Sequence, residues 1–248
     1  MQQKSVMAVV SHLSRPRFDT YLAVAGSDRA ALELYRWNVE MAGALQESLG
    51  VVEVMLRNAI DRELKLWNPQ QPSPTGSAAF AANWVERPAP PLHKILNPPA
   101  RGRGRPAHST FATAKKRAQS DCDLRSPGHP RHRFPVSHDD VVAHITFGTW
   151  VKLLPKKTSG SAVSGQQKLW TDALHAAFPH NPSPLVVHFW VNRLHQLRNR
   201  VAHLEPLILT DVRSYHLTAA RLLGAIEPGL RDWYAGTSRV PVVLAAKP

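Results

Sequence analysis

Apolar side chains recur at three- and four-residue steps through both ends of this chain, and this periodicity decides its fold class. The longest stripe consists of Leu32, Tyr35, Val39, Ala42, Leu45, Leu49, Val52, Leu56, Ala59 and Ile60. Such steps place side chains on one face of an α-helix, whereas a half-buried strand needs strict alternation. Only the short tail from Val240 to Leu244 has a β-like pattern. The sequence therefore predicts an all-α protein.

Residues 1–67 are expected to form the N-terminal helices of a bundle. A short helix over about Phe18–Ala25 precedes Gly26-Ser27-Asp28, a group suited to ending one helix and capping the next. The segment that follows would be about 60 Å long as one straight helix, at 1.5 Å per residue. We therefore expect a bend or break at Gly50 and two packed helices.

Residues 68–136 differ in composition from the rest of the chain. Prolines cluster at 69–72 and 88–91, and proline disrupts helix interiors. Between residues 87 and 138, 11 Lys and Arg face two Asp. They include the Arg-Gly-Arg-Gly-Arg run with Arg101, Arg103 and Arg105. We interpret the segment as an irregular, partly mobile basic Pro/Arg-rich insertion, either an electrostatic arm that guides RNA or a solvated loop.

Residues 137–235 return to helical patterns, with residues 236–248 as a tail. Ser137 and Asp140 have the spacing of a capping box, which predicts a helix from there to about Leu154. Further helices are expected over about 166–178, 184–203 and 211–233. Asp140 and His144 stand four residues apart, as two metal ligands on one helix would. No third ligand at helical spacing supports them, so we expect neither a metal nor another cofactor.

The charge of the chain points to a polyanionic partner. The formal net charge is +13, and a basic surface gains affinity for phosphates by releasing their counterions. Nucleic acid is the first candidate, and the alternative is that the charge only keeps the protein soluble. No run of 18 apolar residues and no secretory signal occurs, so we expect no membrane association. The single cysteine, Cys122, excludes an internal disulfide framework and fits the reducing cytoplasm.

One segment places polar side chains in a rigid helical frame. Leu194, Leu197 and Val201 fix one face of the predicted helix to the core. Arg198 and His203 lie in this frame. Other Arg and His residues have similar spacings, but they lie in or beside the Pro/Gly-rich insertion, where nothing holds two side chains in register. Histidine exchanges a proton near neutral pH, and the arginine fork binds two phosphate oxygens.

The run from Arg198 to Pro206, Arg-Asn-Arg-Val-Ala-His-Leu-Glu-Pro, resembles the signature Arg-Asn-x-x-x-His-His-Glu-Pro of the Abi-like (abortive infection) branch of the HEPN superfamily. The blocks at residues 34–38, 53–59 and 145–154 are similar to other parts of that family. The resemblance spans roughly Ser14 to Leu222 in scattered pieces and leaves out the basic insertion. Leu204 departs from the pattern, because the family commonly has a second histidine there.

The resemblance implies a HEPN-like helical bundle and a metal-independent endoribonuclease. His203 would take the proton of an RNA 2′-hydroxyl, Arg198 would stabilise the phosphate under attack, and Asn199 would orient the imidazole or a phosphate. Five residues on a regular helix turn about 140°, so Arg198 and His203 converge only if the helix ends or distorts between them. The family pairs two such motifs across a two-fold interface, so a homodimer is expected. Further RNA-binding candidates are Arg200, Arg57 and Asn58.

Three functions remain open at this point. The leading hypothesis is an RNA-cleaving effector of antiviral defence or a toxin, restrained by an antitoxin protein or a small RNA. Its rival is a non-catalytic RNA-binding or protein-interaction module with the same bundle and charge. A helical DNA-binding regulator is the third possibility, and it predicts tight binding to duplex DNA with a steep salt dependence and no cleavage.

Overall fold

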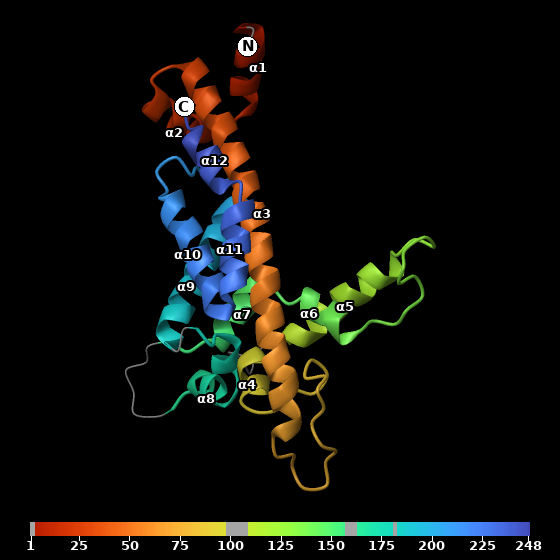
Figure 1. Cartoon of the computed structure of the whole chain (residues 1–248). Helices are drawn as coiled ribbons and strands as arrows, with labels where there is room; N and C mark the ends of the chain where they lie inside the picture. Colours follow the sequence, from red (N-terminus) through yellow and green to blue (C-terminus); the bar gives the residue numbers. More distant parts are fainter. Residues whose placement is uncertain (1–2, 98–108, 157–162, 181–182) are drawn as a thin grey trace, which may run out of the picture. The chain divides into compact units, whose positions relative to one another are not determined.

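Every regular element in the described part of the chain is a helix. The computed structural model describes residues 3–97, 109–156, 163–180 and 183–248 (Figure 1). The α-helices are α1 (Gln3–His12), α2 (Arg15–Ala25), α3 (Asp28–Trp67), α4 (Leu92–Leu96), α5 (Thr110–Asp123), α6 (His138–Ala143), α7 (Phe147–Leu153), α8 (Gly165–Asp172), α9 (Pro184–Ala202), α10 (Val212–Ile226), α11 (Pro228–Thr237) and α12 (Val240–Ala245). Two short 3-10 helices are η1 (Asn68–Gln70) and η2 (Leu174–Ala177). The described residues contain no strand, which confirms the all-α prediction. None of these helices is both long and apolar enough to cross a lipid bilayer.

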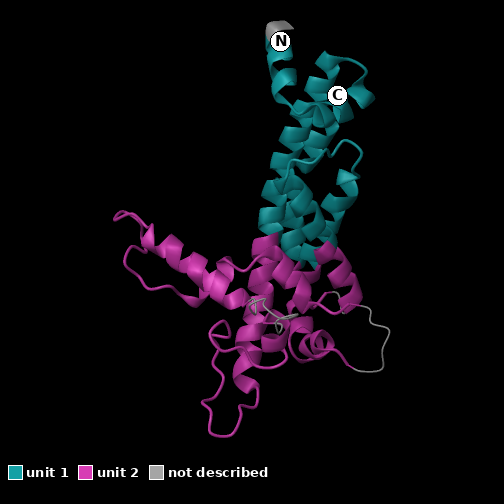
Figure 2. Ribbon diagram, turned by 180° about the vertical axis from the view of Figure 1, so that it is seen from behind, with its two compact units in different colours: residues 1–52, 193–224, 228–248 teal, residues 53–192, 225–227 magenta. Residues whose placement is uncertain are grey.

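The chain folds into two compact units (Figure 2). Unit 1 comprises residues 1–52, 193–224 and 228–248, and unit 2 comprises residues 53–192 and 225–227. Helices α3, α9 and α10 contribute to both units. These boundaries differ from those expected at residues 67, 136 and 235. The expected boundaries followed changes in composition, whereas each unit gathers segments that are distant in the sequence around one core.

The N-terminal half of the chain confirms one predicted helix end and corrects another. Gly26 ends α2 in the left-handed conformation, with φ 74°, as the Gly-Ser-Asp group indicated. Beyond it, α3 is one continuous helix of 40 residues, so the expected break at Gly50 is wrong. Leu49, Val52 and Leu56 are all buried and carry the apolar stripe past the glycine. Packing of this stripe outweighs the roughly 1 kcal/mol that an interior glycine costs a helix.

The C-terminal tail of unit 1 is a packed helix. Residues 240–245 form α12, so the β-like pattern of the tail is misleading. Val240 and Val243 are buried and share one helical face. The indole N–H of Trp37 donates to the carbonyl of Val243 at 2.8 Å, and the Lys247 ammonium donates to the carbonyl of Ile208 at 2.7 Å. The tail therefore belongs to the core of unit 1.

The segment after α3 in unit 2 is ordered around a buried asparagine and a buried tryptophan. The Asn68 amide donates to the carbonyls of Ala81 and Arg87 at 2.7 and 3.1 Å, and its oxygen accepts from the backbone N–H of Ala89 at 2.9 Å. The Trp84 indole donates to Asp61 at 2.8 Å. Residues 71–91 are irregular, as predicted, since they contain no helix or strand. A few polar anchors hold them in place of the regular backbone bonds that the prolines prevent.

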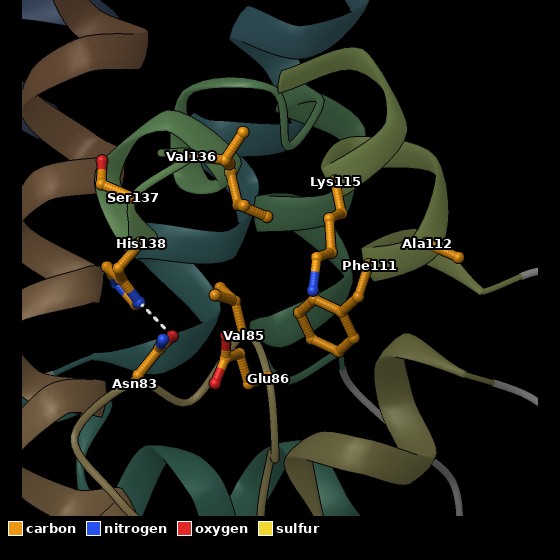
Figure 3. Close-up of a pocket in the computed structure, with 10 residues that line it drawn as sticks. Asn83, Val85, Glu86, Phe111, Ala112, Lys115, Val136, Ser137 and His138 are labelled. Atoms are coloured by element: carbon orange, nitrogen blue, oxygen red, sulfur yellow. Dashed lines mark hydrogen bonds between the residues drawn. The ribbon is translucent and has the colours of Figure 1, made fainter. Parts of the chain in front are cut away.

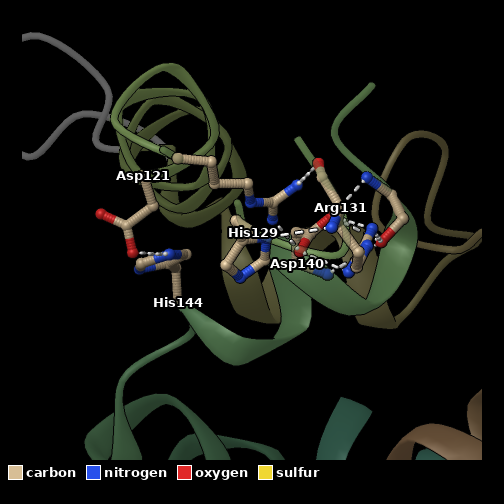
Figure 4. Close-up of polar contacts among 7 residues, drawn as sticks. Asp121, His129, Arg131, Asp140 and His144 are labelled. Carbon is tan, nitrogen blue, oxygen red and sulfur yellow. Dashed lines mark hydrogen bonds and ion pairs between the residues drawn. The ribbon is translucent and has the colours of Figure 1, made fainter. Parts of the chain in front are cut away.

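An arm made of α5, α6 and the loop between them completes this region. Phe111, Ala114 and Ala118 form the buried side of α5, which packs against α6. Asp140 fixes the loop, because its carboxylate accepts from Arg125 at 2.8 Å and from both terminal nitrogens of Arg131 at 2.9 and 2.7 Å (Figure 4). Helix α5 was not predicted, because its short apolar pattern lies inside a Pro- and Arg-rich context.

The helix start at Ser137 was predicted correctly, but its length was not. Ser137 and Asp140 form the expected capping box. The helix ends at Ala143, and a second helix, α7, begins at Phe147. Thr146 lies between them in an extended conformation, with ψ 152°. This break turns the chain, so that Ile145, Phe147 and Trp150 all become buried.

Candidate functional site

The predicted motif lies at the carboxyl end of α9, in the part of that helix that belongs to unit 1. Leu194, Leu197 and Val201 are 1%, 1% and 4% exposed, which confirms the apolar face predicted for this helix. Because that face is packed, the polar residues of the last two turns keep fixed directions around the helix axis. Arg198 belongs to these turns, and His203 follows the last helical residue, Ala202.

The end of α9 is a Schellman motif. The N–H of Glu205 donates to the carbonyl of Arg200, and the N–H of Leu204 donates to the carbonyl of Val201, both at 3.0 Å. These two bonds satisfy carbonyls that the helix leaves without partners. The motif requires a left-handed residue, and here that residue is Leu204, with φ 48°. The position where the family commonly has a second histidine therefore carries backbone strain in this chain.

Three side-chain contacts hold the chain just after the helix. Arg17 donates to the carbonyl of His203 at 3.2 Å. Arg200 donates to the carbonyl of Pro206 at 3.0 Å and pairs with Glu205 at 3.1 Å. The backbone N–H of Leu207 donates to the buried Asn38 side chain at 2.6 Å. The backbone around His203 is thus fixed from α2, α3 and α9, all within unit 1.

Arg17 and Asn38 are positioning residues that the sequence did not reveal. The sequence contains a signal for Asn38, because this polar residue stands next to the apolar stripe of α3. The structure shows that Asn38 is fully buried. Buried amides need hydrogen-bond partners, so a backbone contact could have been expected there. Arg17 offered no signal, since its partner lies 186 residues further along the chain.

The side chains of Arg198 and His203 have no polar partner in the part of the chain that the structure describes. Within the described residues, neither the Arg198 guanidinium nor the His203 imidazole makes a hydrogen bond or an ion pair. His203 is exposed and Arg198 is partly buried. Both groups are therefore available to an incoming ligand.

The helix does not bring the two side chains together in one copy of the chain. The N–H of His203 still donates to the carbonyl of Asn199 at 3.3 Å, so the helical turn continues to His203 without distortion. The two side chains therefore leave the helix axis about 140° apart. Neither side chain lines the two cavities described below or three others in the described residues.

Two other residues of the motif are engaged elsewhere. The amide of Asn199 lies 3.4 Å from Nε2 of His195, one turn back. Among the described residues it makes no hydrogen bond with the His203 side chain, and the expectation that Asn199 orients the imidazole or a phosphate stays a prediction. Arg200, expected to contact RNA, uses its guanidinium to close the helix end.

The remaining RNA-binding candidates lie outside unit 1 or outside the described residues. Arg57 is partly buried and Asn58 is exposed, and both belong to the unit 2 part of α3. Arg101, Arg103 and Arg105 lie outside the residues that the structure describes.

Asp140 and His144, the pair weighed as metal ligands, have separate partners. Asp140 binds Arg125 and Arg131, and His144 pairs with Asp121 at 3.0 Å (Figure 4). Burial would raise the pKa of Asp140, but the hydrogen bonds from Ser137 and the two arginines outweigh it and hold this pKa well below its usual range. The carboxylate is therefore committed to two guanidinium groups.

A second polar cluster surrounds Asp61 in unit 2, and it was not predicted from the sequence. Asp61, His138 and Asp139 present ligand atoms within 4.8 Å of one another. The Lys65 ammonium already contacts both carboxylates, Asp61 at 2.8 Å and Asp139 at 3.1 Å. Burial would raise the pKa of Asp61, but bonds from His138, Lys65 and Trp84 lower it overall. A lysine thus occupies the place that a cation would take.

A cavity lies beside this cluster. It has a volume of about 510 Å³ and is lined by residues that include Asn83, Glu86, Lys115 and His138 (Figure 3). His138 is held on both sides, since Nδ1 lies 2.8 Å from the Asn83 oxygen and Nε2 lies 2.7 Å from Asp61. Neither ring nitrogen is left for proton transfer, so His138 is a structural residue here.

The chain was compared with protein-family models, with curated proteins and with solved structures, and none of the three comparisons gave a match. The resemblance to the Abi-like branch of the HEPN superfamily therefore rests on the sequence blocks alone and stays a prediction. The residues of the described structure carry the functional inferences that follow.

Proposed function

We propose that this protein is a metal-independent endoribonuclease that acts as a homodimer, with His203 and Arg198 as its catalytic residues. One observation carries the proposal: an exposed imidazole without a polar partner stands on a helix end that three side chains and a Schellman motif hold in place. Catalytic groups need such fixed positions, and an accessible histidine serves as an acid or base near neutral pH.

The chemistry follows from these two groups. His203 takes the proton of an RNA 2′-hydroxyl, and the oxygen attacks the adjacent phosphorus. The bond from phosphorus to the 5′-oxygen breaks, and that oxygen takes up a proton from a second acid. Arg198 stabilises the added negative charge on the phosphate during the attack. The products are a 2′,3′-cyclic phosphate and a free 5′-hydroxyl.

The geometry of a single copy supports the proposed homodimer. The two side chains diverge by about 140°, so one copy does not aim both at the same phosphate. A two-fold interface places the same residues of two copies opposite each other. It would supply His203 twice, once as base and once as acid. Activity should therefore fall faster than the protein concentration once dilution separates the dimer, while sedimentation velocity shows a shift to monomer.

The decisive experiment replaces His203 with alanine. Cleavage of a fluorescent single-stranded RNA by H203A should fall by about 10²- to 10⁴-fold. The fall should be similar for R198A, while H180A, which removes another exposed histidine, should keep wild-type activity. A chelator should leave the wild-type rate unchanged. Wild-type cleavage that persists in H203A, or that needs a divalent metal, would overturn the proposal.

A non-catalytic RNA-binding module is the second candidate. The divergence of Arg198 and His203 in one copy and the engagement of Asn199 with His195 favour it. In that case the wild-type protein binds RNA and remains monomeric, and no RNA is cut at any protein concentration.

The proposed physiological role is an antiviral effector or a toxin that acts on RNA in the cytoplasm. Expression of the wild-type protein should then arrest bacterial growth, and expression of H203A should not. A co-expressed antitoxin protein or small RNA would restore growth if such a restraint exists.

A further inference from the structure

Helix α5 carries a basic, hydroxyl-rich stripe that none of the motif residues accounts for. The stripe consists of Thr113, Lys116, Arg117, Ser120 and Asp121, at steps of three, one, three and one residues. Such spacing places all five side chains along one side of a helix. His144, from the end of α6, joins them, and together these six residues line a cavity of about 430 Å³ in unit 2.

The stripe faces away from the packed side of α5. Phe111, Ala114 and Ala118 are buried on that side, and the Phe111 ring meets the Trp84 ring edge-on, with centroids 5.8 Å apart. Lys116, Arg117 and Ser120 are all exposed. Packing of the apolar side therefore fixes the stripe toward solvent.

The cations of the stripe are not neutralised by the protein. Within the described residues, the side chains of Lys116 and Arg117 make no ion pair. The one carboxylate of the stripe, Asp121, pairs with His144 at 3.0 Å (Figure 4). By contrast, Arg125 and Arg131 in the loop that follows are both bound to Asp140. The loop arginines hold the arm together, and the two stripe cations are left for a ligand.

We propose that this stripe of α5 binds the phosphate backbone of RNA. Lys116 and Arg117 are free cations of the kind from which phosphate oxygens accept hydrogen bonds in nucleic-acid complexes. The hydroxyls of Thr113 and Ser120 already donate to the carbonyls of Ser109 and Lys116 at 3.2 and 3.1 Å, so the two cations carry the binding. The stripe has no aromatic residue, so it offers no stacking platform for bases. Binding there is independent of base sequence and dependent on salt. RNA as the natural ligand rests on the proposed ribonuclease function, and the stripe itself does not depend on catalysis.

The test measures binding and cleavage separately. Lys116→Gln and Arg117→Gln are made together, since glutamine is a good helix former and removes only the charge. Affinity for a single-stranded RNA with 2′-O-methyl groups, which cannot be cut, is measured by fluorescence anisotropy between 50 and 300 mM salt. Each lost phosphate contact lowers the slope of log affinity against log salt by about 0.7, so the slope should fall by about 1.4 and the affinity about tenfold near 0.15 M salt.

Two controls make the result specific to the stripe. Lys94→Gln with Lys152→Gln removes the same charge from exposed positions elsewhere in unit 2. Lys115→Gln changes a neighbouring residue on another side of α5, one that lines the cavity of Figure 3. Both controls should bind nearly as well as the wild type. Equal losses of RNA affinity in all variants would show that the stripe is not the binding site. Tighter binding to duplex DNA of the same length would show that RNA is not its ligand.

The two proposals fail in different ways. If H203A is as active as the wild type while the stripe variant loses affinity for RNA, the proposed catalytic site is wrong and the proposed binding site on α5 is supported. If the stripe variant binds RNA like the wild type while H203A is inactive, the proposed binding site on α5 is wrong and the proposed nuclease function is supported. Circular dichroism of each variant should match the wild-type spectrum, because all these positions are exposed.

Discussion

Asp140 illustrates how a single carboxylate orders a segment whose composition argues against order. The side chains of Asp140 and Arg125 are each 12% exposed, so their mutual attraction is only weakly screened by water. The same carboxylate accepts from the backbone and hydroxyl of Ser137 at 2.8 and 2.7 Å. One residue thus caps α6 and fixes the basic loop before it.

Removal of this carboxylate should therefore be costly. Asp140→Ala leaves two guanidinium groups without their partner, and we expect a loss of about 3 kcal/mol in the free energy of unfolding. The matched control is Asp139→Ala at the adjacent position, whose side chain is 77% exposed, and its loss should stay below about 1 kcal/mol. Urea denaturation measures both. Equal losses for the two variants would show that Asp140 does not organise the arm.

For His203 and Arg198, the sequence motif predicts where the residues lie but not the directions of their side chains. The sequence placed both in a rigid frame, and the structure places both on the last turns of a packed helix. Their directions, however, depend on where the helix ends. The helical bond from His203 to Asn199 keeps the turn regular, so the two side chains leave the helix in different directions.

At the scale of elements, the end of α9 contains a residue that is poorly suited to its conformation. Left-handed backbone at a Schellman position favours glycine, because an L side chain there meets the following carbonyl. Leu204 has φ 48° and its side chain is 38% exposed, so little packing compensates for the strain. The helix end is kept by its two backbone bonds and by the contacts of Arg17 and Arg200.

Glycine at this position should therefore stabilise the protein. Leu204→Gly relieves strain of about 1 to 2 kcal/mol and adds about 0.5 to 1 kcal/mol of chain entropy to the unfolded state, for a net gain of about 0.5 to 1 kcal/mol. Thermal unfolding should show a higher melting temperature. Leu204→Ala keeps the strain and should give no gain. If alanine stabilises as much as glycine, removal of an exposed leucine is the cause and strain is not.

At the scale of the whole molecule, two partly buried histidines should make the protein sensitive to mild acid. Burial lowers the pKa of His216, whose Nδ1 lies 2.9 Å from the Tyr234 hydroxyl, and burial followed by the charge of Lys156 lowers the pKa of His188. The unfolded chain therefore binds more protons than the folded one below the ordinary histidine pKa of about 6.5. Stability is complete above that pH and falls as the pH drops below it.

The pH dependence can be assigned to one of these residues by substitution. His216→Gln keeps an acceptor for the Tyr234 hydroxyl and removes the titrating group. The free energy of unfolding of this variant should fall less between pH 7 and pH 5 than that of the wild type. Asp61 and Asp140 do not disturb this window, because their lowered pKa values make their contributions fall only below about pH 4. Parallel pH profiles for variant and wild type would exclude His216 as the cause.

The sequence by itself determined the helical class and the packed face of α9, and it located the cap at Ser137 and the helix end at Gly26. These features depend on residues within a few positions of each other, where periodicity and capping chemistry act directly. Tertiary structure decided the rest. It kept α3 helical past Gly50, turned the tail into α12, ordered the arm through Asp140 and fixed the backbone beside His203 through Arg17 and Asn38. Those outcomes depend on partners many residues away, whose contact energies no local pattern contains.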